Sequence, residues 1–239
     1  MYEYDSRVGF SQCDVNAHLS ITSLIDIFQD SSTFQSHDLG VGFKTLEKDK
    51  LAWIINYWEI DIEKMPKLCD RVIVGTQPYE FKGFLGFRNF CLKDEKGNYL
   101  VKANSIWTLL DMEKMRPVKA PDYIREAYIL GDKLDMEYGS RKVMIPEEGE
   151  VSKNEMEPVM VMLHHLDGNH HMNNGQYIKI AMSQVEGDVA VKRLRADYRQ
   201  QAMLGDSIYP VVYRMDNVWV ISLNDSEGKP YSVVEITTV

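Results

Sequence analysis

Hydrophobic and polar positions along the chain predict two similar halves, each with one helix and several strands. In the first half, apolar positions from Ile21 to Phe28 recur at helical spacing, which predicts a helix over about 20–36 that Ser20 or Thr22 can cap. Runs rich in aromatic and β-branched residues predict strands at 2–10, 51–62, 71–80, 85–93 and 99–110. This order predicts an α+β unit in which a long antiparallel sheet wraps one helix.

The second half repeats this order after a segment of different composition. Residues 112–150 contain three prolines and many charges, which predicts a connection between two domains. Beyond it, strand patterns occur near 157–164, 189–200, 206–214, 216–223 and 231–238, with a helical pattern near 174–184. We therefore predict an N-terminal unit of residues 1–128, a linker of residues 129–152 and a C-terminal unit of residues 153–239.

A short polar motif with the spacing Asp-x-Asn-x-His stands directly before each predicted helix. Its members are Asp14, Asn16 and His18 in the first half and, 153 residues later, Asp167, Asn169 and His171 in the second. The turn-forming runs 94–98 and 225–229 also correspond, each before a β-rich run. Two copies of one unit, the second with shorter connections, account for these matches.

Composition and charge restrict the function classes. The chain has 239 residues, 44% hydrophobic and 26% charged, as in ordinary globular proteins, and its net charge of −9 argues against bulk nucleic-acid binding. No apolar run has the length of a membrane span, and the N-terminus shows no targeting segment. Cys13, Cys69 and Cys91 show neither a disulfide framework nor metal-ligand spacing. These features predict a cytoplasmic protein with free thiols.

The stretch 164–178 holds the densest set of chemically useful side chains. It lies between an apolar run and a helical pattern, which predicts a polar loop that leads into a helix. Asn173 or Asn174 can cap that helix, and Gly175 lets a ligand approach the backbone closely. The free N–H groups at a helix start can face a carbonyl oxygen. This stretch is therefore the candidate active site.

The run from Leu166 to Ile178 resembles the signature of the acyl-acyl-carrier-protein thioesterases of plants and bacteria, whose form is Asp-x-Asn-x-His-apolar-Asn-Asn-x-x-Tyr-Ile. The chain length, the first helix and the run 197–199 also fit that family. The resemblance implies a tandem hotdog fold, in which each unit is a central helix wrapped by a long antiparallel sheet. It also implies hydrolysis of fatty acyl thioesters of acyl carrier protein, without a cofactor. In that family the first unit supplies most of the acyl pocket.

Thioester hydrolysis needs an activated water and a place for the developing oxyanion. His171 can be the general base, because imidazole titrates near neutral pH. Asp167 can orient that ring or polarise water, and the amide of Asn169 can hold water or the carbonyl. We expect no covalent intermediate on Ser or Cys, because Ser183 is far along the helix and the second half has no Cys.

One position departs from the resembled family. Plant members typically carry Tyr-Arg-Arg-Glu-Cys after the motif helix, where this chain has Tyr198-Arg199-Gln200-Gln201-Ala202. Gln201 stands where that family has a glutamate with an assigned catalytic role. An amide cannot accept a proton at neutral pH, so we predict that Gln201 positions a water or His171 at most. An ordinary strand residue is the alternative.

Other polar residues near the motifs have structural explanations. We interpret Asp14, Asn16 and His18 as a residual cap and loop brace, with a second working site as the alternative. His164, His165 and His170 are predicted to be solvent-facing or structural rather than catalytic. A metal site is not expected there, since no second cluster of Cys or Asp supplies the remaining ligands. Five apolar residues could line an acyl channel, although each is a core residue by default: Phe28, Trp53, Ile55, Trp58 and Trp107.

An acidic carrier protein would need a basic patch for docking on this acidic chain. The candidates are Arg141, Lys142, Lys192, Arg193, Arg195 and Arg199, and a solvated strand face is the alternative. A homodimer is compatible with the sequence. Three other functions stay open: a coenzyme A thioesterase, a non-catalytic acyl-thioester binder and a hotdog hydratase. The hydratase motif places Asp and His five apart around a proline, whereas here they are four apart without one.

Overall fold

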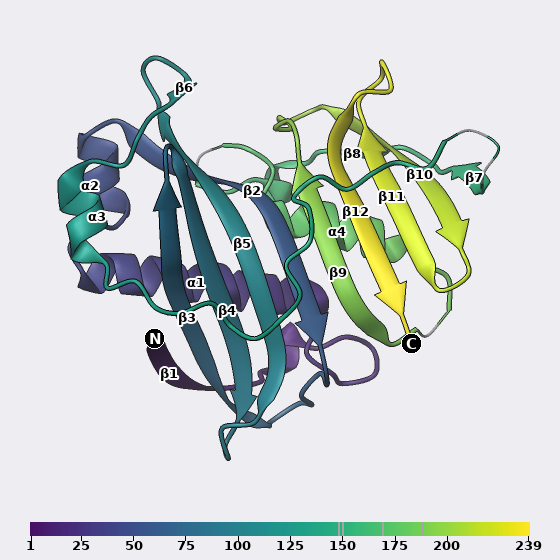
Figure 1. Ribbon diagram of the computed structural model, residues 1–239. Coiled ribbons are helices and arrows are strands. Elements are labelled where there is room, and N and C mark those ends of the chain that lie inside the picture. Colours follow the sequence, from purple (N-terminus) through teal and green to yellow (C-terminus); the bar gives the residue numbers. More distant parts are fainter. Residues whose placement is uncertain (148, 150, 169, 188) are drawn as a thin grey trace. The chain divides into compact units, whose positions relative to one another are not determined.

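The computed structural model describes residues 1–147, 149, 151–168, 170–187 and 189–239, and these form two compact units (Figure 1). The first unit comprises Met1–Asn56 with Ile60–Tyr138, and the second comprises Tyr57–Glu59 with Gly139–Val239. Strand β2 (Leu51–Ile62) therefore contributes residues to both units. The residues predicted as a linker, 129–152, divide between the units after Tyr138.

The first unit has the predicted strand, helix and antiparallel sheet. Its sheet has the order β1-β3-β4-β5-β2, and the short strand β6 pairs with β5. The remaining elements are β1 (Tyr2–Arg7), the 3-10 turn η1 (Phe10–Gln12), α1 (Ile21–Asp38), α2 (Phe43–Lys48), β3 (Arg71–Lys82), β4 (Leu85–Asp94), β5 (Tyr99–Asp111), β6 (Arg116–Pro117) and α3 (Asp122–Ala127). Ser20 caps α1 as predicted, because its hydroxyl accepts the N–H of Ser23 at 3.2 Å. Helix α2 was not predicted.

The second unit repeats the arrangement with a shorter helix. Its sheet has the order β9-β12-β11-β10-β7, and β8 pairs with β10. The elements are β7 (Ser152–Glu155), β8 (Val159–Met160), the 3-10 turn η2 (Leu163–His165), α4 (Asn174–Ser183), β9 (Val191–Tyr198), β10 (Ser207–Met215), β11 (Val218–Asn224) and β12 (Pro230–Thr238). The strand predicted at 157–164 is wrong for most of its length, because a 3-10 turn occupies Leu163–His165.

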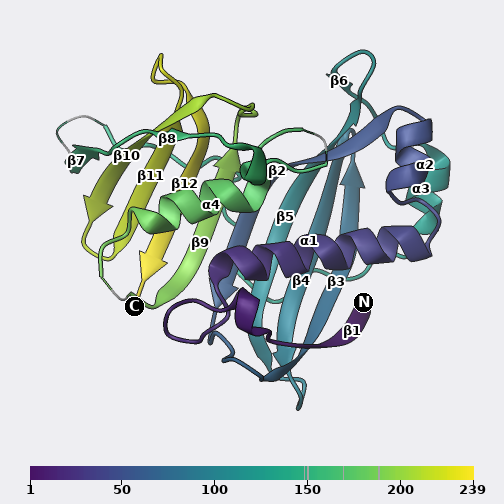
Figure 2. The same ribbon diagram turned by 180° about the vertical axis from the view of Figure 1, so that it is seen from behind.

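Each unit buries one helix against one face of its own sheet, and Figure 2 shows both helices from their exposed side. Helix α1 buries Leu24, Ile25 and Phe28 completely, and the ring of Phe28 stacks on that of Phe90 at 5.3 Å. Helix α4 buries Ile178 and Ala181 in the same way. This burial follows the 3.6-residue spacing of the apolar positions and holds the start of each helix against the sheet.

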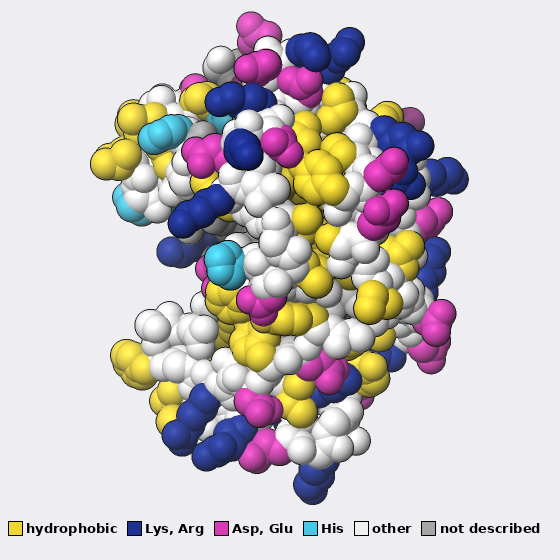
Figure 3. Space-filling view, turned by 90° about the vertical axis from the view of Figure 1, so that its left-hand side faces the viewer, with side chains coloured by type: hydrophobic (Ala, Val, Ile, Leu, Met, Phe, Trp, Pro, Cys, Tyr) yellow, Lys and Arg dark blue, Asp and Glu magenta, His cyan; other side chains and the backbone are white. Residues whose placement is uncertain are grey.

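The face of the molecule drawn in Figure 3 is mixed in charge. Acidic and basic side chains lie there among hydrophobic ones rather than in separate areas. Within the part of the chain that the structure describes, no helix combines the length and the apolar character that crossing a membrane requires.

Candidate active site

A tight loop places the second motif directly before α4. Asp167 and His171 close the loop through their backbones, since the N–H of Asp167 donates to the carbonyl of His171 at 2.8 Å. The N–H of His170 donates to the carbonyl of Asp167 at 3.1 Å, and His170 has a φ of 62°. That left-handed conformation turns the chain sharply before His171. Leu166 and Met172 pair across the base of the loop, so the two candidate catalytic side chains come from one turn.

The carboxylate of Asp167 also braces the loop. Its Oδ1 lies 3.4 Å from the N–H of His171, a long contact with the backbone of the predicted base. Asp167 and His171 are both half-buried. Asn169, the third predicted catalytic residue, lies outside the described residues.

The start of α4 is capped as predicted. The side chain of Asn173 accepts the N–H of Gly175 at 2.8 Å, and Asn174 is the first residue of the helix. The N–H of Asn173 itself donates to the carbonyl of His165 at 2.9 Å. A helix start beside Asp167 and His171 can stabilise negative charge on an oxygen placed there.

The loop after β9 is tied to this motif through Ala202, which is fully buried. The N–H of Met172 donates to the carbonyl of Ala202 at 3.0 Å, and the N–H of Ala202 donates to the hydroxyl of Tyr177 at 2.8 Å. Gln201 precedes Ala202 and is exposed. The structure therefore brings the backbone of Gln201 beside the motif.

The hydroxyl of Tyr177 is itself held firmly. Burial is the main cause that raises the pKa of Tyr177 to about 12, so the phenol stays neutral at pH 7. Its ring meets the ring of Tyr198 edge-on at 5.7 Å, and the hydroxyl of Tyr198 donates to the carbonyl of Asn174 at 3.0 Å. Two tyrosines thus link α4 to the end of β9.

The first motif has the same backbone geometry. The N–H of Asp14 donates to the carbonyl of His18 at 2.8 Å, and Ala17, which corresponds to His170, has a φ of 60°. Oδ1 of Asp14 accepts the N–H groups of Asn16 and His18 at 2.9 and 3.0 Å. Asp14 and Asn16 are exposed and His18 is half-buried. The carboxylate of Asp14 therefore holds the backbone of its own loop through two N–H groups.

His165 has a structural role in the turn before the motif. Its Nδ1 accepts the N–H of Met162 at 3.0 Å, and its ring lies 4.1 Å from that of His164. Burial, together with the nearby His164 and Lys179, lowers the pKa of His165. His164 and His170 are exposed. Among the described residues, no group of three His, Cys, Asp or Glu side chains could hold a metal ion.

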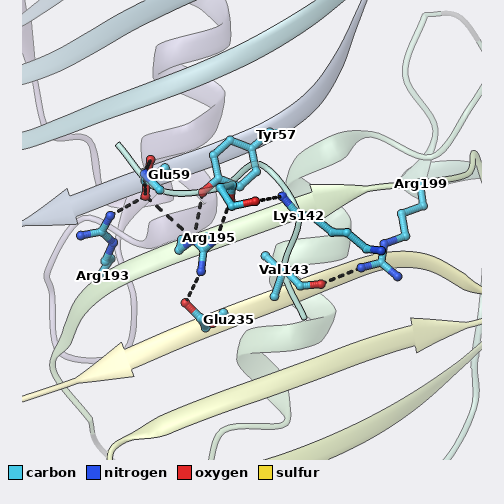
Figure 4. A network of polar contacts seen from close by, with 10 residues as sticks. Tyr57, Glu59, Lys142, Val143, Arg193, Arg195, Arg199 and Glu235 are labelled. Atoms are coloured by element: carbon cyan, nitrogen blue, oxygen red, sulfur yellow. Dashed lines mark hydrogen bonds and ion pairs between the residues drawn. The ribbon is translucent and has the colours of Figure 1, made fainter. Parts of the chain in front are cut away.

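Three of the predicted docking residues, Arg193, Arg195 and Arg199, take part through their side chains in a polar network in the second unit (Figure 4). Arg193 forms an ion pair with the fully buried Glu59, and Arg195 lies 3.9 Å from the same carboxylate. Both oxygens of Glu59 also accept the N–H of Gly139 at 3.0 Å. Arg199 pairs with Asp197 at 2.9 Å and donates to the carbonyl of Val143 at 2.7 Å.

Arg195 is the most heavily bonded member of this network. It donates to Tyr57 at 2.9 Å, to Glu235 at 2.9 Å and to the carbonyl of Ser140 at 2.6 Å. Burial alone would lower the pKa of Arg195, but the bonds with Tyr57 and Glu235 raise it above the ordinary value. Lys192, Arg141, Lys142 and Arg199 are exposed. Of these, Arg199 is paired with Asp197, so the predicted patch consists mainly of Lys192, Arg141 and Lys142.

Sequence reasoning missed the roles of Tyr177 and Glu59. Tyr177 is part of the motif, but a tyrosine at a buried helical position is by default a core residue. Glu59 carried a stronger signal, since it is a lone carboxylate in the apolar run 57–60 and buried charges need partners.

Comparisons of the sequence point to one family. Residues 1–128, more than half of the chain, match the family model of the acyl-ACP thioesterase N-terminal domain. A curated relative from Cuphea viscosissima, the chloroplastic acyl-[acyl-carrier-protein] hydrolase FATB3, is 28% identical over 248 residues. That match includes 90% of this chain but 59% of the relative, so the chain spans about three fifths of the relative's length.

Solved structures agree on the fold. An acyl-ACP thioesterase from Bacteroides thetaiotaomicron superposes with a TM-score of 0.89 at 18% identity, covering 99% of this chain and 97% of that one. A 12:0-ACP thioesterase from Umbellularia californica gives 0.85 at 15% identity, covering 100% of this chain and 98% of that one. At these identities the likeness concerns the fold alone. It confirms the predicted tandem hotdog fold of class α+β.

Proposed function

Since the chain belongs to the acyl-ACP thioesterase family, we propose that it hydrolyses fatty acyl thioesters of acyl carrier protein (ACP) to a free fatty acid and the carrier thiol. The observation that carries this proposal is the second motif on its turn before α4. There Asp167 and His171 stand half-buried beside a capped helix start. A general base next to the positive end of a helix dipole is an arrangement that supports acyl transfer to water.

His171 acts as the general base in this mechanism. Its neutral imidazole takes a proton from water while the water oxygen attacks the thioester carbonyl carbon. The resulting oxyanion is stabilised by the positive end of the α4 helix dipole, and the tetrahedral intermediate then breaks its C–S bond. The imidazolium returns the proton to the departing thiolate, and the carboxylic acid product then loses its own proton to solvent water. Asp167 fixes the turn on which His171 stands.

Amide side chains position the reactants. We assign Asn169 to the reacting water or carbonyl, because an amide both donates and accepts. Gln201 follows β9 beside the motif and takes a similar role, since an amide cannot serve as a base. Asn173 supports the site as the cap of α4. Asp14, Asn16 and His18 form a loop brace in this proposal, in accord with the backbone contacts of Asp14.

The first unit binds the acyl chain in this proposal. Phe28 and Ile55 of this unit are buried, as is Trp58, which belongs to the second unit, whereas Trp53 and Trp107 are half-buried and a hydrocarbon chain could cover their exposed part. The indole N–H of Trp107 donates to the hydroxyl of Ser105 at 2.7 Å, which fixes one side of the ring. Trp53 and Trp107 are therefore the better candidates for the acyl channel.

ACP docks on the second unit through exposed basic residues. Lys192, Arg141 and Lys142 have their side chains at the surface, while Arg193 and Arg195 are already paired with carboxylates. A patch of a few positive charges attracts an acidic carrier even when the net charge of the enzyme is negative.

The test compares matched substrates. Lauroyl-ACP and lauroyl-CoA are incubated with the chain, and released thiol is measured with a thiol reagent. We expect the carrier substrate to have the higher kcat/KM and His171→Ala to lower kcat by about two to four orders of magnitude with little change in KM. Preference for lauroyl-CoA would make the chain a coenzyme A thioesterase. Binding without hydrolysis would make it a non-catalytic binder, and near-normal turnover of His171→Ala would remove the base.

A further inference from the structure

The loop after β9 has a counterpart in the first unit, which serves as an internal control. Residues 202–206 match residues 66–70: the N–H of Met203 donates to Oδ2 of Asp206 at 2.8 Å, and the N–H of Lys67 donates to Oδ2 of Asp70 at 2.8 Å. Gly205 and its counterpart Cys69 both have positive φ, 88° and 71°. The two loops therefore have one backbone design.

Both loops meet the helix of their own unit through the same hydrogen bond. The N–H of Leu19 donates to the carbonyl of Pro66 at 2.8 Å, as the N–H of Met172 donates to that of Ala202 at 3.0 Å. This bond satisfies the residue before the helix cap in each unit. The bond occurs in both units, although the first unit has no counterpart of the Gln201 amide. Folding alone therefore accounts for it.

The two units differ at the next contact. Pro66 has no N–H, and the buried Leu24 occupies the helix position that Tyr177 has in the second unit. In the second unit Ala202 has an N–H, and the 98% buried Tyr177 supplies the acceptor at 2.8 Å. A proline and a leucine are therefore enough to fold this junction, and the tyrosine–alanine pair adds a polar bond that folding does not need.

We propose that Tyr177 is a positioning residue for catalysis: by accepting the N–H of Ala202, its hydroxyl holds the backbone of Gln201 where the Gln201 amide can orient the reacting water. This inference rests on the proposed thioester hydrolysis. The first unit has Met65 at the position of Gln201, so it has no amide there to hold and no need of the bond. The extra bond occurs in the unit that carries the candidate active site.

The bond suits this role because both partners are fixed. The ring of Tyr177 is buried and meets Tyr198 edge-on, so its hydroxyl has little freedom to follow a moving loop. Loss of the hydroxyl leaves the N–H of Ala202 buried without its acceptor, which costs free energy. A shift of the loop toward solvent lowers this cost, because water can then accept the N–H. A shift of about 1 Å in a positioning group is enough to reduce turnover strongly.

Tyr177→Phe is the first test, with Tyr79→Phe as the matched control. Tyr79 loses a hydroxyl bond of 2.8 Å to Asn104 in the first unit, and its kcat should stay unchanged. For Tyr177→Phe we expect kcat to fall about tenfold with KM within about twofold. The double variant Tyr177→Phe/Gln201→Ala should be no slower than Gln201→Ala alone, because both act through the same amide.

Two further measurements keep the outcome clear. Hydrogen exchange of the Ala202 amide should accelerate in Tyr177→Phe, which reports the bond independently of activity. Ala202→Pro copies the first unit and removes the donor while leaving the Tyr177 ring in place, so it should lower kcat by a similar factor even if Tyr177→Phe folds poorly. Normal kcat with accelerated exchange, or additive losses in the double variant, would overturn the proposal. A wild type that hydrolyses no thioester would overturn the proposed function, and this inference with it.

Discussion

The side chain at position 201 determines whether His171 is the only proton acceptor in the proposed site. A neutral amide can orient water but cannot take its proton, so His171 carries the transfer alone in this proposal. Gln201→Ala should therefore lower kcat by roughly tenfold, less than the loss of a general base. Gln201→Glu should retain activity, and its carboxylate should raise the pKa of a nearby imidazole. Because the base must be neutral, the acidic limb of the kcat/KM profile should move to higher pH. Unchanged rates and profiles in both variants would place Gln201 outside the site.

His165 and Gln12 occupy equivalent positions in the two motif loops, but only the histidine can make the stability of the fold depend on pH. Nδ1 of His165 accepts the N–H of Met162 at 3.0 Å, and Oε1 of Gln12 accepts the N–H of Gly9 at 2.8 Å. The pKa of His165 is lowered in the folded chain, mainly by burial, relative to about 6.5 for a free imidazole. The unfolded chain therefore binds the proton first as the pH falls.

This linkage has a definite sign. The contribution of His165 to stability is complete above about pH 6.5 and is lost as the pH falls from there through the lower folded pKa. His165→Gln should keep the bond, as Gln12 does, and remove this part of the acid loss. Urea unfolding of both chains at about pH 7.5 and about pH 5 measures the difference. An equal loss of stability in both chains would contradict the assignment.

At the scale of elements, Glu59 anchors the middle of strand β2, Tyr57–Glu59, within the second unit. A fully buried carboxylate with two arginines and a backbone N–H is costly to disrupt, because removal of one partner leaves uncompensated charge. We expect Glu59→Gln to lower the free energy of unfolding by about 3 kcal/mol. Urea denaturation measures this, with circular dichroism to show that the variant is folded.

Glu235→Gln is the matched control for Glu59. It removes a carboxylate that also pairs with Arg195, at 2.9 Å, but its side chain is 23% exposed. Water can replace part of that interaction, so the loss should be about 1 kcal/mol or less. Equal losses in the two variants would show that burial of Glu59 does not set the strength of the network.

The elements that sequence predicted well are those whose signal is local. The helix cap at Ser20 and the turn at residues 94–98 depend on neighbours a few residues away, and both form as predicted. The strand expected at 157–164 failed because apolar runs do not distinguish a strand from the 3-10 turn of Leu163–His165. Partners distant in sequence, such as Tyr177 with Ala202, were not predicted, since a pattern reports burial but not the partner.

At the scale of the whole molecule, the sequence predicted two units in succession, but it did not predict that the residues of β2 divide between them. Residues 51–56 and 60–62 of this strand belong to the first unit, whereas Tyr57–Glu59 belongs to the second. Hydrophobic periodicity gives β2 as one strand and cannot assign its middle to another unit. The contacts of Tyr57 and Glu59 with Gly139, Arg193 and Arg195 agree with this assignment.

Because β2 contributes residues to both units, we expect the chain to unfold in a single transition. If the first unit melted alone, β2 would lose its order and withdraw Glu59 from Arg193, which costs the second unit about 3 kcal/mol. That is a large fraction of the 5–15 kcal/mol that stabilises a typical domain, so the half-folded state should be sparsely populated. Single-tryptophan variants that keep Trp107 in the first unit or Trp219 in the second should give coincident urea midpoints. Adding Glu59→Gln should separate the two midpoints, because the shared strand then no longer couples them. Separate midpoints in the presence of Glu59 would show that the two units unfold independently.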